Sequence, residues 1–150
     1  MPQSLSKVIL HIIFSTKNRE PWLDSNVRPR MHAYLGTICR DMGADLAHVG
    51  GVADHVHIVT TLPRTLSQAQ LIEQIKKLSS KWIKTLDTRY RGFFWQRGYG
   101  AFSVSPSQLE AVLRYITINW STIAHAHFRK NIGSCCASTG SVLTSDFIWD

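Results

Sequence analysis

The chain is poor in cysteine and has no long hydrophobic run. Its three cysteines include an adjacent pair, Cys135 and Cys136. An odd count with this spacing excludes a disulfide framework and suits zinc poorly, which favours a reducing cytoplasm. No apolar run approaches the roughly 20 residues of a membrane span, and Met1 to Ser4 do not begin a secretion signal. We therefore expect a cytoplasmic protein with no membrane segment.

Acidic side chains are also few, with 10 Asp and Glu against 17 Lys and Arg, so the net charge is +7 and the pI about 9.7. A basic protein favours an anionic partner, and nucleic acid is the first candidate. The alternative is a protein that is basic without such a partner. The 44% hydrophobic content over 150 residues, without repeats or low-complexity segments, indicates one packed domain.

Hydrophobic periodicity predicts strands alternating with helices. Ser25 and Ser67 are the expected helix N-caps, and Gly50-Gly51 the expected hairpin turn. The predicted strands cover residues 5–16, 44–49, 52–62 and 93–104, and the predicted helices 25–42, 67–86 and a third from 106. The first six elements match the ferredoxin-like βαββαβ arrangement. We predict an α+β fold whose antiparallel sheet is backed by two helices, with an additional C-terminal helix.

A pair of histidines, His55 and His57, flanks Val56 inside a predicted strand. Because strand side chains alternate between faces, both imidazoles project from the same face. Two neutral imidazoles can bind a divalent cation, which can polarise a phosphoryl oxygen. The alternative is a pair of core histidines satisfied by hydrogen bonds.

Tyr115 on the last predicted helix is the candidate nucleophile. A phenol with a pKa of about 10 attacks poorly until it is activated. The alternative is a core aromatic beside Val112 and Ile116.

Basic side chains with interleaved aromatics lie along the second predicted helix and in the segment after it. This pattern suits single-stranded nucleic acid. The predicted DNA-binding residues are Lys76, Lys77, Lys81, Lys84 and Arg97. The alternative is a solvated helix face.

Four segments together resemble one known family. They read LSKVILHIIFSTKNREPWL, GGVADHVHIV, SSKWIK and FWQRGYGAFSVS, in this order, within a resemblance that covers about residues 3–117. The chain resembles the single-tyrosine transposases of the IS200/IS605 type, which belong to the His-hydrophobic-His endonuclease superfamily.

The resemblance implies a transposase that cuts and rejoins single-stranded DNA at the hairpin ends of a mobile element. Tyr115 would form a 5′-phosphotyrosine link, and His55 and His57 would hold Mg²⁺ or Mn²⁺. It also implies a homodimer whose tyrosine helix can serve the partner's histidines, acting on DNA of the nucleoid.

One position departs from the family pattern. The family's Gln ligand, four residues after the tyrosine, is here Asn119, with the same carbonyl chemistry on a shorter stem. Asn119 is the predicted third metal ligand. The alternative function is an impaired relative that only binds single-stranded DNA. A zinc protein would need more ligands than His55 and His57.

The C-terminal tail departs as well. We predict a catalytic domain over residues 1–125 and a divergent tail over 126–150 that packs poorly. A deletion near codon 118, compensated near residues 142–146, would explain the tail, because synonymous codons read out of phase can restore the Gln and a charged helix. Ordinary divergence is the alternative, and the gene's DNA sequence decides between them.

Overall fold

The structure, a computed structural model, describes residues 4–117. Four strands form one antiparallel sheet in the order β2-β3-β1-β4. They are β1 (Ile9–Ser15), β2 (Ala47–Gly51), β3 (His55–Thr61) and β4 (Gly100–Ser103). The long central strands carry β-branched residues, which suit a buried sheet. The predicted α+β, ferredoxin-like fold is confirmed.

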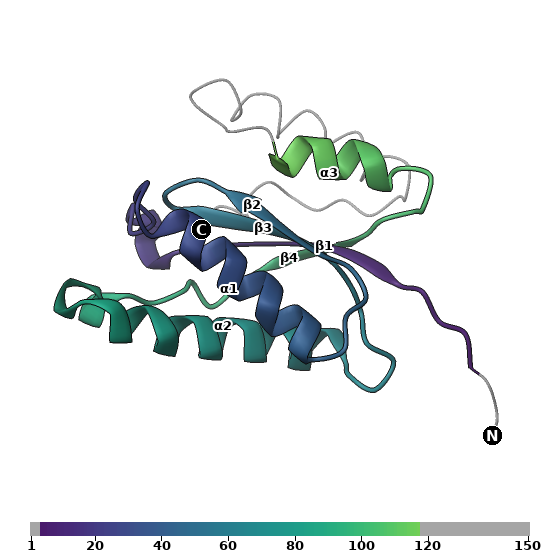
Figure 1. Cartoon of the computed structure of the whole chain (residues 1–150), viewed down its shortest axis with the longest axis horizontal. Helices are drawn as coiled ribbons and strands as arrows, with labels where there is room; N and C mark the ends of the chain where they lie inside the picture. The colour runs from purple at the N-terminus through teal and green to yellow at the C-terminus, as the bar shows by residue number, and fades with distance from the viewer. Residues whose placement is uncertain (1–3, 118–150) are drawn as a thin grey trace.

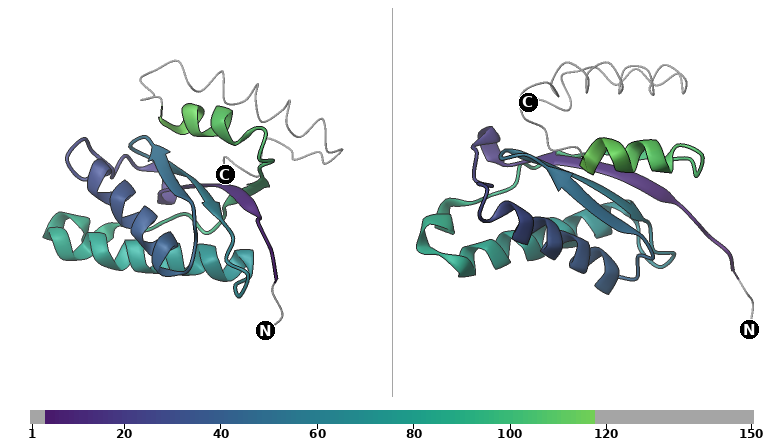
Figure 2. Two further views of the ribbon diagram at one scale, coloured as in Figure 1. Left: turned by 45° about the vertical axis from the view of Figure 1, so that its right-hand side comes forward. Right: turned by 45° about the horizontal axis from the view of Figure 1, so that its top comes forward.

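Helices cover both faces of this sheet (Figures 1 and 2). One face carries α1 (Arg28–Asp41) and α2 (Gln68–Leu86), and α3 (Leu109–Thr117) crosses the other. Short 3-10 helices, η1 (Lys17–Arg19) and η2 (Thr88–Gly92), follow β1 and α2. Among residues 4–117, no helix is long and apolar enough to cross a membrane.

The alternation along β3 divides its side chains between two hydrophobic clusters. Val56 and Ile58 are fully buried in the main core, together with apolar residues of α1 and α2. Val59 belongs to a smaller cluster with Ile9 and Ile116, against which Tyr115 packs. Because His55 and His57 share the face of Val59, they lie on the side of the sheet that α3 covers.

Side-chain caps fix the helix starts. As predicted, Ser67 caps α2: its Oγ accepts from the Gln70 N–H at 3.1 Å, and the Gln70 side chain accepts from the Ser67 N–H at 2.9 Å. The prediction of Ser25 as the cap before α1 is wrong. Asp24 Oδ1 accepts from the N–H groups of Asn26 and Val27, because its carboxylate reaches both.

The prediction of a hairpin turn at Gly50-Gly51 is also wrong. Both glycines lie in β2, paired with His57 and Val56, and residues 52–54 make the connection. Gly51 has a φ of 146°, a conformation that favours glycine. The backbone conformation that favours glycine therefore occurs inside the sheet, at the end of β2, rather than in a turn.

All four strands are shorter than predicted, the first and the fourth most of all. The first begins at Ile9, and Leu5 is fully exposed. The fourth begins only at Gly100, because the carbonyls of residues 96–98 accept from Lys76 Nζ instead of extending the ladder. Asn119 and residues 126–150 lie outside the described residues, so the third ligand, the tail and the domain boundary stay predictions.

Candidate active site

The predicted histidine pair stands side by side on the α3 face of β3. The ring centroids of His55 and His57 are 5.1 Å apart, with the planes at 68°. His57 is 4% exposed, and burial holds its pKa well below the ordinary value. His57 is therefore a neutral imidazole at pH 7, the form that binds a metal ion.

α3 brings Tyr115 to this pair. The Tyr115 ring centroid lies 5.8 Å from that of His57, nearly perpendicular to it. Partial burial raises the pKa of the Tyr115 phenol, which keeps it protonated at neutral pH. The structure therefore unites the predicted nucleophile with the predicted metal ligands, although Tyr115 also packs against the smaller apolar cluster.

The sequence interpretation missed a third imidazole, His11 on β1. Its Nε2 lies 3.0 Å from Nδ1 of His57, and the two rings stack at 5.3 Å. Burial lowers the pKa of His11 to about 4. Strand alternation gives His11 a face, but its contact with His57 depends on the register that sets Ile13 opposite His57.

A carboxylate and a guanidinium behind His55 were missed as well. Asp54 Oδ1 lies 2.7 Å from Nδ1 of His55, and its Oδ2 lies 3.1 Å from an Arg19 nitrogen. Burial alone would raise the pKa of Asp54, but the hydrogen bond with His55 and the charges of His55 and Arg19 lower it below its ordinary value. The sequence offered one indication of this contact, since Asp54 directly precedes His55.

These groups suit a divalent cation. Each imidazole of the pair uses Nδ1 in a hydrogen bond, and a cation would take the Nε2 atoms. Among residues 4–117, no cluster of three or more His, Cys, Asp or Glu side chains could hold a metal ion. A cation held by His55 and His57 would therefore have to complete its shell with water, phosphate oxygens or a ligand beyond residue 117.

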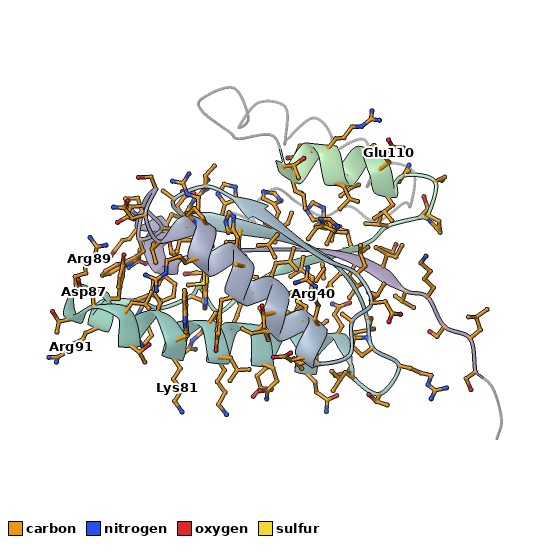
Figure 3. All side chains as sticks on the ribbon, viewed as in Figure 1. Arg40, Lys81, Asp87, Arg89, Arg91 and Glu110 are labelled. Atoms are coloured by element: carbon orange, nitrogen blue, oxygen red, sulfur yellow. The ribbon has the colours of Figure 1, made fainter. Side chains whose placement is uncertain are left out.

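The predicted DNA-binding residues lie elsewhere. The exposed side chains of Lys77 and Lys81 belong to α2, across the sheet from α3. Figure 3 shows Lys81 pointing away from the sheet on one side, with Glu110 of α3 on the other. Of the predicted set, Arg97 is also exposed, and Lys84 Nζ lies 4.0 Å from the centroid of the Phe94 ring. The structure does not bring this set to Tyr115.

Lys76 has a structural position in this set. Its Nζ donates to the carbonyls of Gln96, Arg97 and Gly98 at 2.8, 3.2 and 2.7 Å. Burial lowers its pKa to about 8. The sequence predicted a basic side chain at Lys76, but not that the carbonyls of residues 96–98 would accept its hydrogen bonds.

Two solved structures show the same fold. A "putative transposase" from Deinococcus radiodurans is 20% identical, with a TM-score of 0.61 over 77% of this chain and 95% of that one. A REP-associated tyrosine transposase bound to a REP hairpin is 17% identical, with a TM-score of 0.56 over 79% of this chain and 70% of that one. A search of curated protein sequences finds no match.

This chain thus shares its fold with both of these proteins. A family model described as "Transposase IS200 like" matches residues 4–119, well over half of the chain. The chain belongs to the IS200-like transposase family, which confirms the resemblance inferred from its motifs.

Proposed function

We propose that this transposase cuts and rejoins single-stranded DNA by attack of Tyr115 on a backbone phosphate. The observation that carries the proposal is the position of Tyr115, whose ring centroid lies 5.8 Å from that of His57. Perturbed pKa values cluster at functional sites, and burial shifts the pKa of His11, His57 and Tyr115 here. Family membership supports the same assignment.

The reaction exchanges one phosphate ester for another. The Tyr115 oxygen bonds to phosphorus while the bond to the 3′ oxygen breaks, which leaves a 5′-phosphotyrosine and a free 3′-hydroxyl. The phenol proton passes to water, and the leaving 3′ oxygen takes up a proton to become the hydroxyl. Because the ester bond is conserved, the reverse attack by a 3′-hydroxyl rejoins strands without ATP.

His55 and His57 would hold the cation, Mg²⁺ or Mn²⁺. When bound, the cation polarises the scissile phosphate and stabilises the charge that develops on it. Asn119, four residues after Tyr115 in the sequence, stays the proposed third ligand.

The proposed substrate is single-stranded DNA carrying a hairpin, since one similar structure is bound to a REP hairpin. Lys77, Lys81, Lys84 and Arg97 would contact DNA phosphates remote from the scissile one, because α2 lies across the sheet from Tyr115. We also propose a homodimer, for which light scattering of the purified protein is the test.

Covalent adduct formation tests this function. A hairpin oligonucleotide with single-stranded flanks is incubated with the protein and Mn²⁺, then run on a denaturing gel. We expect an adduct from the wild type and none from Tyr115→Phe.

A second candidate is a protein that binds single-stranded DNA without cutting it. Asn119 in place of the family's Gln and the raised pKa of Tyr115 favour it. Tight hairpin binding by the wild type with no adduct in Mg²⁺ or Mn²⁺ would establish this candidate instead.

A further inference from the structure

The two histidines of the pair are held by the same ring atom. Nδ1 of His55 lies 2.7 Å from Asp54 Oδ1, and Nδ1 of His57 lies 3.0 Å from Nε2 of His11. Asp54 lies in the connection before β3 and His11 lies on β1, and the two partners differ in chemistry. A neutral imidazole carries its proton on one nitrogen only, so each partner influences which nitrogen that is.

Asp54 fixes the proton of His55. An ionised carboxylate only accepts hydrogen bonds, so the short contact requires a proton on Nδ1. Arg19 takes the other oxygen, with Nη2 and Nε at 3.1 and 3.2 Å from Oδ2. The Asp54 carbonyl also accepts from the Thr16 N–H at 2.9 Å, which ties the connection before β3 to the end of β1.

His11 contacts the corresponding ring atom of His57, but its own nitrogen can either donate or accept. The two rings lie diagonally across β1 and β3 and stack with planes at 26°. Their contact needs one donor and one acceptor. If His57 donates from Nδ1, its Nε2 carries a lone pair, whereas the reverse arrangement would place the His57 proton on Nε2 and block a cation.

We propose that His11 and Asp54 are positioning residues that hold the proton of His57 and of His55 on Nδ1, so that both Nε2 atoms present lone pairs to one divalent cation. This inference rests on the proposed function only for the cation, because the tautomers are a property of the metal-free protein. Partners of this kind orient metal-binding imidazoles, and their loss typically weakens metal binding about 10–100-fold.

The tautomers are read from long-range ¹H–¹⁵N spectra of the metal-free, ¹⁵N-histidine-labelled protein at pH 7.5. We expect His55 and His57 each to carry the proton on Nδ1. A proton on Nε2 of either residue overturns the inference for that residue. This measurement needs no variant, so misfolding of a mutant cannot obscure it.

Two variants separate positioning from packing. In Asp54→Asn, Arg19 should bind the amide oxygen and turn the NH₂ toward His55, which moves that proton to Nε2 while His57 is unchanged. In His11→Phe, a ring of similar size keeps the stacking but removes the acceptor, so His57 alone should lose its fixed tautomer. His48→Phe, at an exposed site of β2, is the matched control.

Cation affinity is measured separately, from free Mn²⁺ by electron paramagnetic resonance. We expect Mn²⁺ binding about 10–100-fold weaker in Asp54→Asn and in His11→Phe, and unchanged in His48→Phe. Wild-type affinity in either variant overturns the positioning role while leaving the proposed function intact. Correct tautomers in a wild type that binds no Mn²⁺ would instead contradict the proposed function.

Discussion

The carbonyl oxygen of Ile116 occupies the space that a side chain at Gly50 would need. Gly50 pairs with His57 across β2 and β3, so α3 rests on the sheet beside the candidate metal ligand. Tyr115 directly precedes Ile116, and its ring reaches His57 and His11 from there. The absence of a side chain at Gly50 therefore sets the distance between the tyrosine and the histidines.

Gly50→Ala should consequently separate the nucleophile from the histidine pair. A Cβ at this position would collide with Ile116 backbone, so α3 must move outward. A displacement near 1 Å can cost about 100-fold in rate, and we expect that loss in adduct formation on the hairpin oligonucleotide. Gly98→Ala is the matched control, because a Cβ there meets nothing within 4 Å. Wild-type adduct yield in Gly50→Ala would contradict this role.

A half-buried histidine, His32, should make the fold sensitive to acid. Burial and the charge of Arg28 lower the pKa of His32 from 6.5 to about 4. Between these values the unfolded chain binds a proton that the folded protein does not, so stability is kept above about pH 6.5 and falls toward pH 4. Urea unfolding at several pH values measures the slope.

His32→Leu isolates this contribution. The His32 Nε2 atom is buried without a hydrogen-bond partner among the described residues. An apolar side chain should flatten the pH slope of the unfolding free energy and stabilise the protein by about 1–2 kcal/mol near pH 5. An unchanged slope would show that His32 does not contribute.

Substitutions of Lys76 and of Lys77 should have different effects, the first on folding stability and the second on DNA binding. Lys76→Met leaves the carbonyls of residues 96–98 without their shared donor, so we expect a loss of about 1–2 kcal/mol in the free energy of unfolding. Lys77→Met, at an exposed position one residue on, should change it by less than about 0.5 kcal/mol.

If α2 contacts DNA phosphates, Lys77→Met should also weaken hairpin binding and reduce its salt dependence. Equal hairpin affinity for Lys77→Met and the wild type from low to high salt would argue against that surface.

Each chain should use its own tyrosine. Tyr115 lies beside His57 of the same chain, whereas the family resemblance also allows the tyrosine of one subunit to act with the histidines of its partner. A mixture of Tyr115→Phe and His57→Ala proteins should therefore form no adduct. Recovery of activity in the mixture would show that the tyrosine helix is exchanged between subunits.

Local patterns predicted the parts of the site that depend on one element. Strand alternation placed His55 and His57 on a common face, and the sequence around Ser67 specified the start of α2. The contact of His11 with His57 could not be predicted in this way, since it depends on the register between β1 and β3.

Long-range contacts also decided the basic residues and the glycines. The sequence does not distinguish Lys76 from the other lysines of its helix. Only its hydrogen bonds to the loop of residues 96–98 do so. Gly50 read as a turn residue, because the helix that excludes its side chain follows more than fifty positions later.

The most direct measurement is the location of the covalent DNA adduct by mass spectrometry of the digested protein. The chain has four tyrosines, at positions 34, 90, 99 and 115. We predict a nucleotide adduct on Tyr115 in the presence of Mn²⁺, absent in His57→Ala. An adduct on another tyrosine, or on Tyr115 at full yield in His57→Ala, would contradict it.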